Sequence, residues 1–414
     1  MQQTSTTNLI KDIRFTNIGA LIVKVTHRCN LDCSYCYENI TKGEDMPIET
    51  FKALVDKVMD NSIREKIAFI FHGGEPTLVS TTWYQEAVKY ANYKAALVNK
   101  TVRYSLQTNL LNVTYEQLKA FKDLEINLGV SVDGPVDIPT PYRKRAAKAI
   151  SNLHLANSIG LKTGILLNIN QTNYQYFDKI MIWLENEIKV RLVKANVAYA
   201  VGHGIGLSDM YPEHIHQAYS SILNYMIYTK GTKVVEENMA IELLRFFETK
   251  VNPSKFSSLC GVEKCGAGKE VVGVTTEGNI LPCGRFEWNN QDFFLGNLQE
   301  QITSVVQDKY LSLVKSFHSL VPENWFNCKT CAAKQICSYG CQAFIVRSNS
   351  QMNIECIPTK MRYEYLQDKS NQFREVLNGI KQISKFAELI PKSEYGDNAG
   401  DNPNYNDTYD DIRD

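Results

Sequence analysis

Six short apolar runs alternate with segments of helical period over the first half of the chain, and this alternation constrains the fold more than any other feature of the sequence. The runs are residues 21–25, 67–71, 102–107, 126–132, 163–169 and 195–201. No hairpin signal joins them, so the pattern predicts a parallel sheet covered by helices. Six βα units are fewer than the eight of a closed barrel. We therefore expect an α/β fold built as a partial, open-sided barrel.

The segments between the runs carry signals of helix starts and buried helix faces. Apolar residues recur at helical spacing in residues 51–59 and again in residues 177–188. Pro47 suits the first turn of the earlier helix, and Thr114 with Gln117 predicts a capping box at the start of another. These signals predict helices on the connections between strands.

Polar and glycine-rich residues follow each of the first four predicted strands. They are the cysteine-containing loop 29–36, His72-Gly73-Gly74-Glu75-Pro76, Gln107-Thr108-Asn109 and Ser131-Val132-Asp133-Gly134-Pro135. In parallel α/β folds, ligands bind at the carboxyl ends of the strands. One such segment is an ordinary turn, but four of them beside a cysteine loop predict a binding site on this rim.

The loop after the first strand has the spacing C-x3-C-x2-C at Cys29, Cys33 and Cys36. Closed structural zinc sites and electron-transfer iron–sulfur clusters take four protein ligands. Three cysteines on one loop therefore favour an iron–sulfur cluster with one iron open to a ligand that is not protein. A zinc site completed by His27 or by a distant cysteine is the alternative.

Beyond residue 201 the alternation stops. Residues 202–206, Gly-His-Gly-Ile-Gly, lack the features of a dinucleotide fingerprint and are predicted to form a flexible loop. Residues 212–250 are predicted to be largely helical. The expected domains are a flexible N-terminal arm (1–18), a barrel core with connecting helices (19–250), a cysteine-rich domain (251–360), a C-terminal helix (361–392) and an acidic disordered tail (393–414).

Composition excludes several classes of protein. The chain of 414 residues has 45 Lys plus Arg against 45 Asp plus Glu, a balance that gives no footprint for nucleic acid or anionic membrane. No secretory signal opens the chain, and the longest apolar runs are too short to span a bilayer. We therefore expect a cytoplasmic protein, in which clustered cysteines indicate metal ligands before disulfides.

Eight further cysteines lie in the second half of the chain. They are Cys260, Cys265, Cys283, Cys328, Cys331, Cys337, Cys341 and Cys356. Eight is two sets of four, so one open cluster and two fully ligated clusters use every cysteine in the chain. A zinc ribbon at Cys328 and Cys331 is the alternative, because zinc takes the same ligands.

These patterns resemble those of a known family. Cys265-x12-Gly278-x4-Cys283, then C-x2-C-x5-C-x3-C from Cys328 to Cys341, and then Cys356 resemble the SPASM domain of radical SAM enzymes. The first loop, with Tyr35 before its last cysteine, resembles the radical SAM signature. The joint match covers residues 19–360. It implies that Cys29, Cys33 and Cys36 hold a [4Fe–4S] cluster whose open iron binds S-adenosylmethionine (SAM).

The resemblance also assigns roles to other residues. It implies that Gly73, Gly74, Glu75 and Pro76 contact the methionine amino group, that Tyr35 lies against the adenine, and that Gln107, Ser131 and Arg143 contact the methionine and ribose. It further implies two auxiliary clusters, one held by Cys260, Cys265, Cys283 and Cys341 and the other by Cys328, Cys331, Cys337 and Cys356. The implied cofactors are three [4Fe–4S] clusters and SAM.

The implied activity is that of a radical SAM oxidoreductase acting on a peptide. A 5′-deoxyadenosyl radical takes hydrogen from an unactivated C–H bond, and the barrel must shield it from water. If the substrate radical then bonds to sulfur, carbon or oxygen and loses an electron, the net change is a two-hydrogen oxidation. Fully ligated auxiliary clusters are plausible electron acceptors.

Two functions within the family compete. Sulfatase maturases, which form formylglycine, carry an Asp after the cysteine that matches Cys283, whereas this chain has Gly284. The leading hypothesis is therefore maturation of a ribosomally made precursor peptide by an intrapeptide C–C, C–S or C–O cross-link, with formylglycine formation as the alternative. Dehydrogenation of a small alcohol or sugar is a third option, and an iron–sulfur electron carrier or a zinc-stabilised binding module is the non-enzyme alternative.

The last expectations concern binding partners and a catalytic base. Fewer than twenty residues precede the first strand, so no N-terminal winged-helix peptide-recognition domain is expected. The precursor peptide would bind the barrel directly or be presented by a separate protein, and a flavodoxin or ferredoxin would donate electrons. The sequence identifies no catalytic base. Glu287, Asp209 and Tyr339 are weak candidates, and His27 and His72 are predicted to be hydrogen-bonded structural histidines.

Overall fold

A parallel sheet forms the centre of the protein. The computed structural model describes residues 11–38, 43–139, 141–204, 210–248, 265–287, 289–319, 326–347 and 353–387. The strands of the barrel core are β1 (Ala20–Thr26), β2 (Lys66–Gly73), β3 (Thr101–Thr108), β4 (Ile126–Ser131), β5 (Thr163–Ile169) and β6 (Leu192–Val197). They lie side by side in sequence order and all pair in parallel. The predicted α/β fold with an open-sided six-strand core is confirmed.

The sixth strand starts earlier than its apolar run suggested, at Leu192 instead of residue 195, and it ends at Val197. Lys194 interrupts the apolar pattern in the sequence and hides the start of the strand. In the structure its ammonium lies 3.0 Å from a carboxylate oxygen of the buried Glu237. A buried charge is tolerated in a strand where an ion pair and hydrogen bonds compensate its desolvation.

The sheet continues beyond both ends of this core. The short strand β7 (Val235–Glu236) pairs in parallel with β6, so one further strand follows the point where the alternation stops in the sequence. At the other edge β8 (Val271–Val274) pairs in parallel with β1, followed by antiparallel β9 (Asn279–Leu281) and β10 (Gly296–Asn297). The cysteine-rich region therefore shares one sheet with the barrel.

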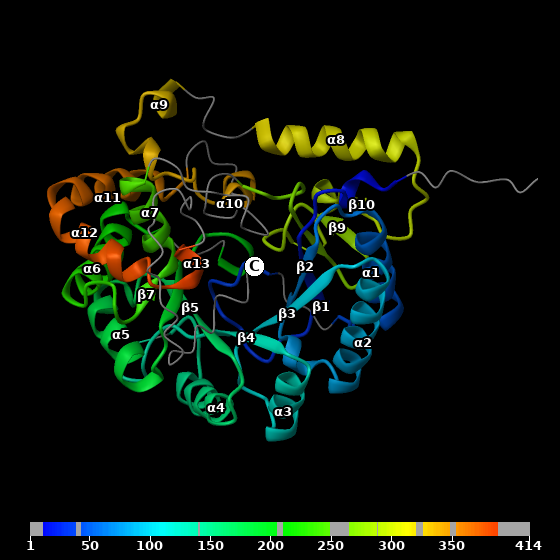
Figure 1. The fold of residues 1–414 in the computed structure, drawn as a ribbon, viewed down its shortest axis with the longest axis horizontal. Helices are drawn as coiled ribbons and strands as arrows, with labels where there is room; N and C mark the ends of the chain where they lie inside the picture. Colours follow the sequence, from blue (N-terminus) through cyan, green and yellow to red (C-terminus); the bar gives the residue numbers. More distant parts are fainter. Residues whose placement is uncertain are drawn as a thin grey trace, which may run out of the picture.

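Helices cover the outer side of this curved sheet (Figure 1). The connecting helices are α1 (Ile48–Asn61), α2 (Thr81–Leu97), α3 (Tyr115–Asp123), α4 (Ala146–Ser158) and α5 (Phe177–Trp183). The later ones are α6 (Pro212–Tyr228), α7 (Glu237–Phe247), α8 (Ser304–Ser319), α9 (Phe326–Lys329), α10 (Gln342–Arg347), α11 (Cys356–Asp368), α12 (Ser370–Ile380) and α13 (Ser384–Ala387). Figure 1 shows α6, α7, α11 and α12 grouped on the β7 side of the sheet, and α8 beyond β10 at the opposite edge.

The predicted helix starts are close to those observed. Pro47 is the N-cap residue of α1, one position before the helix. Thr114 caps α3 by accepting a hydrogen bond from the Gln117 N–H, but the Gln117 side chain donates to the carbonyl of Thr77, so the capping box is only half formed. The helix predicted over residues 177–188 is α5 followed by one π-helical segment, Leu184–Ile188.

The two ends of the described chain differ from the prediction. A flexible N-terminal arm was expected at one end and a single C-terminal helix at the other. Within residues 11–18, Phe15 and Ile18 are buried, and Arg14 pairs with Asp12 and Glu300. The predicted C-terminal helix is three helices, α11 to α13. Residues 1–10 and the predicted acidic tail lie outside the described residues. Among the helices that the structure describes, none combines the length and apolar character needed to cross a membrane.

Candidate active site

A cavity of about 190 Å³ lies at the carboxyl ends of the barrel strands. The four polar segments predicted to share this rim all contribute to its wall. Its lining includes Cys29, Cys33, Cys36, Tyr35, Gly73, Gly74, Glu75, Gln107, Asn109, Ser131 and Arg143. Pro76 is buried next to this wall as the first residue of a short 3₁₀ helix. The structure thus brings the sequence-predicted residues of the first half of the chain together.

The three cysteines of the first loop sit in a poorly solvated environment. Burial raises the pKa of Cys29 to about 11 and that of Cys36 to about 12, and it also raises the pKa of Cys33. Thiols with such pKa values remain protonated at neutral pH, and only a bound metal makes them thiolates. Three thiols on one short loop, facing a cavity, are a fitting donor set for an iron–sulfur cluster with an open iron.

The glycines after β2 allow an unusually close backbone approach to the cysteine loop. Gly74 N–H donates to the carbonyl of Thr26 (2.9 Å), and Glu75 N–H donates to the carbonyl of Arg28 (2.7 Å). A β-carbon at Gly73 would stand 2.3 Å from the Thr26 oxygen, and one at Gly74 would stand 2.1 Å from the Arg28 oxygen. Only glycine fits at both positions, so the two segments form one cradle beside Cys29.

Glu75 is held rigidly by this cradle. Its carboxylate accepts hydrogen bonds from the Thr77 N–H and hydroxyl, the Thr108 hydroxyl and the Asn109 N–H, at 2.7–3.0 Å. Burial raises the pKa of Glu75, and these hydrogen bonds oppose the rise. Asn109 also donates to Asn30 within the cysteine loop (2.7 Å). Glu75 and Asn109 therefore tie three strand ends together.

Tyr35 and Arg143 both lie against Asp133, a residue to which the sequence assigned no role. The Tyr35 hydroxyl donates to Asp133 (2.5 Å) and accepts from Arg143 Nε (2.8 Å). Burial raises the pKa of Asp133, and the charge of Arg143 opposes that rise. On the adjacent strands, Gln107 donates to the Ser131 hydroxyl (2.7 Å). All of these residues line the cavity. Their hydrogen bonds to one another fix their relative positions before any ligand binds.

A second wall of the cavity comes from the cysteine-rich region. Arg285, two residues after Cys283, lines the cavity together with Tyr37 and His72. Its guanidinium lies over the ring of Tyr37 at 5.0 Å and over that of Phe344 at 5.3 Å. Sequence reasoning missed Arg285 because no local signal places the turn after Cys283 against the first loop.

The weak candidates for a base have structural partners. Glu287 forms an ion pair with Arg347 at 2.8 Å. His27 bonds the Thr276 hydroxyl (2.8 Å), and His72 bonds Tyr37 (3.2 Å), as predicted for structural histidines. Tyr339 lines a different cavity, and Asp209 lies outside the described residues.

Part of the predicted flexible loop packs on the cysteine loop. Gly202–Gly204 is a short 3₁₀ helix, and the His203 N–H donates to the Cys36 carbonyl (2.8 Å). A β-carbon at Gly202 would stand 2.4 Å from the Tyr37 carbonyl oxygen. Residues 205 and 206 lie outside the described residues. The glycine at 202 therefore serves a close approach to the candidate site.

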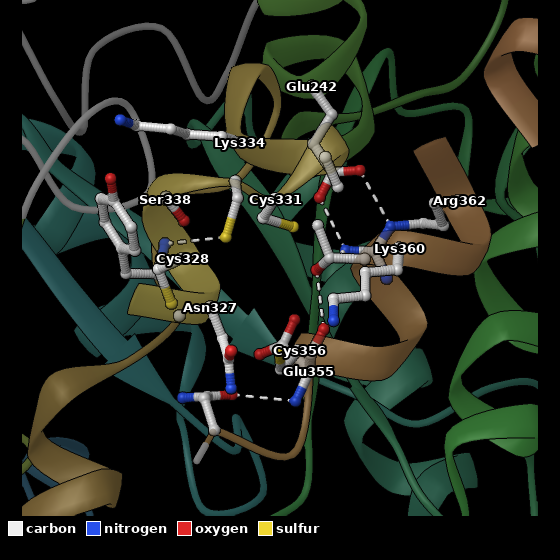
Figure 2. A pocket seen from close by; sticks show the side chains of 16 residues that line it. Glu242, Asn327, Cys328, Cys331, Lys334, Ser338, Glu355, Cys356, Lys360 and Arg362 are labelled. Atoms are coloured by element: carbon white, nitrogen blue, oxygen red, sulfur yellow. Dashed lines mark hydrogen bonds and ion pairs between the residues drawn. The ribbon is translucent and has the colours of Figure 1, made fainter. Parts of the chain in front are cut away.

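The later cysteines fall into two groups. Cys328, Cys331, Cys337 and Cys356 line a cavity of about 680 Å³ (Figure 2). Cys265, Cys283 and Cys341 pack around one buried apolar cluster built on Leu281, Phe286 and Phe317. Cys260 lies outside the described residues. Among the residues described, no three or more His, Cys, Asp or Glu side chains are arranged to hold one metal ion.

The four cysteines implied for one auxiliary cluster line a single cavity, and three of the four implied for the other pack on a single apolar cluster. Cys341 is separated from Cys337 by only three residues, yet it packs on the same apolar cluster as Cys265 and Cys283, and it also borders the main core. Asn353 helps to fix this arrangement, since its side-chain amide donates to the Cys341 carbonyl (3.3 Å). The ligation of two auxiliary clusters by these cysteines stays a prediction.

Comparisons with known proteins agree with this geometry. Residues 23–184 match the family model of the Radical SAM superfamily. An uncharacterised protein of Methanocaldococcus jannaschii is 31% identical over 40% of this chain and 57% of its own length. The cysteine-type anaerobic sulfatase-maturating enzyme of Clostridium novyi is 29% identical over 40% of this chain and 47% of its own length. The matched part thus spans about half the length of these two relatives.

A longer match and two solved structures extend the likeness. The cysteine-type anaerobic sulfatase-maturating enzyme of Clostridium perfringens is 23% identical over 84% of this chain and 96% of its own length. The structure of anSMEcpe with bound AdoMet and Cp18Cys peptide has a TM-score of 0.70 at 18% identity, covering 87% of this chain and 99% of that one. Streptococcus suis SuiB bound to precursor peptide SuiA has a TM-score of 0.57 at 15% identity, covering 83% and 76%. At these identities the structural likeness concerns the fold.

Proposed function

Because residues 23–184 are a radical SAM domain, we propose that this chain is a maturase that oxidises a residue of a ribosomally made precursor peptide and installs an intrapeptide C–C, C–S or C–O cross-link. Relatives named as sulfatase-maturating enzymes and a fold shared with peptide-bound anSMEcpe and SuiB support a peptide as substrate. The observation that carries the choice of cross-linking is the close contact between Gly284 and Ile22, described below.

The cavity residues fit the cofactors of such an enzyme. Cys29, Cys33 and Cys36 would hold the [4Fe–4S] cluster. SAM would be held by Tyr35, Gly73, Gly74, Glu75, Pro76, Gln107, Ser131 and Arg143. The bound pair supplies a radical that abstracts hydrogen from the substrate. The protein's own contribution is a rim whose polar groups are already positioned, as the hydrogen bonds of Glu75 and Asp133 indicate.

The second half of the chain would supply the electron acceptors. In this proposal residues 251–360 are a SPASM domain, in which Cys260, Cys265, Cys283 and Cys341 hold one auxiliary [4Fe–4S] cluster and Cys328, Cys331, Cys337 and Cys356 hold the other. Arg285 supports a functional link, because the turn that carries Cys283 also forms part of the wall of the candidate active site. A cluster held by these cysteines would supply an electron acceptor for the oxidation.

Gly284 favours cross-linking over formylglycine formation. The sulfatase maturases that this chain resembles place an Asp here as the base that finishes the oxidation. A β-carbon at position 284 would stand 2.3 Å from Cγ2 of Ile22 on β1. The position therefore lacks both the carboxylate and the space for it. Forming a bond to a group within the peptide also releases one proton, and in this proposal its acceptor lies elsewhere in the cavity wall.

Formylglycine formation remains the second candidate. The names of several relatives favour it, including one matched over 96% of its own length. In that case the base would come from another residue of the cavity wall, such as Glu38. The proposal also includes a flavodoxin or ferredoxin as electron donor and a separate protein that presents the peptide.

Mass spectrometry of co-expressed peptides tests the proposal. The chain is expressed anaerobically with short peptides encoded beside it, and each peptide is analysed intact and after tandem fragmentation. Loss of two hydrogens together with missing fragments between two residues supports a cross-link. A mass change of Cys to formylglycine in a sulfatase-like peptide supports the second candidate. Unmodified peptides of both kinds, with SAM cleaved, would contradict a peptide substrate.

A further inference from the structure

Two asparagines on neighbouring strands face the candidate active site. Asn168 on β5 and Asn196 on β6 are direct partners in the parallel pairing of these strands, and both line the cavity of about 190 Å³. Side chains at paired positions of adjacent strands point to the same face of the sheet. This asparagine pair therefore forms one polar patch on the cavity wall, and it belongs to none of the four segments predicted to share the rim.

The backbone that carries the asparagine pair is held in place by its neighbours. The Asn168 carbonyl accepts a hydrogen bond from Asn173 Nδ2 (2.7 Å), and the Asn168 N–H bonds the carboxylate of Asp133. One residue further along, the Ala198 N–H of the β6 side donates to the Ile169 carbonyl of β5 (2.8 Å). Side chains on such a fixed backbone bind a ligand with a small loss of conformational entropy.

The side-chain amides of the asparagine pair make no hydrogen bond to the part of the chain that the structure describes. Asn168 Oδ1 is buried without a partner. The preceding pair on the same face offers none, because Leu166 is apolar and the Lys194 ammonium lies 3.0 Å from the Glu237 carboxylate. Buried amide groups are normally hydrogen-bonded, and an unpaired one costs free energy. The pair is therefore available to a ligand that enters the cavity.

The chemistry of two adjacent amides limits which ligand they match. Each amide has N–H donors on its nitrogen and an acceptor on its oxygen. A neutral group that carries both a donor and an acceptor, such as a backbone peptide unit, satisfies both kinds of atom. A carboxylate only accepts hydrogen bonds, and the pair offers it no positive charge. The residues expected to hold SAM follow β1 to β4, so the pair lies on the part of the wall to which no SAM contact is assigned.

We propose that Asn168 and Asn196 bind a backbone amide of the peptide substrate in the candidate active site. The inference rests on the proposed function, because it requires a peptide as substrate. It adds that the peptide is held at this point by its backbone and not by a particular side chain. Recognition at the pair is therefore independent of the peptide's sequence.

Binding measurements test the pair without using turnover. Anaerobically reconstituted protein is compared with Asn168→Ala, with Asn196→Ala and with Asn168→Leu, which keeps the volume of the side chain. The control is Asn127→Ala, because Asn127 faces the same side of β4 as Ser131 but lies near the start of the strand, outside the cavity wall. Peptide binding is measured by fluorescence anisotropy with two labelled probes, a short peptide encoded beside this chain and a sulfatase-like peptide that contains Cys. Equilibrium dialysis measures SAM binding.

The asparagine variants should bind both probes about tenfold more weakly, because a peptide group buried against them loses its hydrogen-bond partner. SAM affinity should stay unchanged, and the control should bind like the unmodified protein. N-methylation of each peptide amide in turn then identifies the bound unit. Methylation at one position should weaken binding to the unmodified protein and have a much smaller effect on the asparagine variants, since the two changes remove the same contact.

Three results would overturn the inference. Asparagine variants that bind the probes as well as the control does would show that the pair makes no contact with the peptide, and the proposed function would stand. A fall in SAM affinity in the asparagine variants would assign the pair to the cofactor. An unmodified protein that binds neither probe would overturn the peptide substrate and, with it, this role of the pair.

Discussion

Gly284 and Ile22 approach so closely that a β-carbon on the glycine would stand 2.3 Å from the isoleucine Cγ2 and 3.0 Å from its Cβ. The turn after Cys283 is therefore pressed against β1, between the barrel and the cysteine-rich region. This contact decides which residue can stand at position 284. It also brings Arg285 into the cavity.

Replacing Gly284 by Ala should destabilise the protein by about 1–3 kcal/mol, because overpacking forces neighbouring backbone to move. The free energy of unfolding, measured with denaturant, gives this cost. The matched variant Ile22→Ala removes the methyl group that the new β-carbon would meet. In the Ile22→Ala background, Gly284→Ala should lower the free energy of unfolding by clearly less than in the unmodified protein. An equal loss in both backgrounds would refute the packing argument.

Glu75→Gln should weaken both stability and SAM binding. The carboxylate accepts four hydrogen bonds, one of them on Oε2 from Asn109, and an amide NH₂ group would face a donor in either orientation. We expect a loss of about 1–3 kcal/mol in unfolding free energy. Thr77→Val, which removes one hydroxyl donor to Glu75 and keeps the backbone N–H, is the control and should cost less. SAM affinity equal to that of the unmodified protein would count against a role for Glu75 at the site.

Arg143 and Asp133 should show strong coupling in a double-mutant cycle. Arg143→Met leaves the buried Asp133 carboxylate without its cation and should cost about 3–5 kcal/mol. Adding Asp133→Asn removes that carboxylate, so the double variant should be less destabilised than the sum of the single ones. Unfolding in denaturant measures all four proteins. Additive effects would show that the two charges do not interact.

Glu236 should give the protein a stability that falls as pH rises. Burial raises the pKa of this carboxyl from 4.5 to about 7, despite hydrogen bonds from Ala195 and Met239. Between about pH 4.5 and 7 the folded state keeps a proton that the unfolded state has lost, so this group's stabilising contribution decreases with pH through that window. The decrease is on the order of 3 kcal/mol.

Glu236→Gln tests that dependence directly. The variant cannot titrate, so the slope of unfolding free energy against pH between pH 5 and 7 should become more positive than in the unmodified protein. The amide also faces two N–H donors, which lowers stability at every pH without changing the slope. Asp123→Asn, an exposed carboxylate on α3, is the control. An unchanged slope would show that Glu236 is already ionised in this window.

Local patterns in the sequence were enough to predict the barrel core and the first half of the site. Short apolar runs predicted β1 to β5, and the cysteine spacing with the glycine-rich turn at the end of β2 pointed to one rim. The start of β6 was missed because Lys194 interrupts its apolar pattern. The ion-pair partner of Lys194, Glu237, is 43 residues away. Charges that are paired only in three dimensions leave no periodic signal.

Contacts between distant segments explain the rest of what was missed. The pairing of β8 with β1 joins residues about 250 positions apart, and it brings Arg285 to Tyr37. Asp133 lies in a segment that the sequence did single out, but its hydrogen bond to Tyr35 spans 98 residues. Such long-range contacts depend on how the whole sheet is assembled, so residue spacing alone does not predict them.

The release of 5′-deoxyadenosine tests the central claim most directly. Anaerobically reconstituted protein is given dithionite and SAM, and it is compared with a variant in which Cys29, Cys33 and Cys36 are all Ala. We predict release by the unmodified protein, with about twelve irons bound, and no release by the variant, which should keep about eight irons. Fully loaded protein that fails to cleave SAM, or a variant that still cleaves it, would contradict the assignment of this cavity.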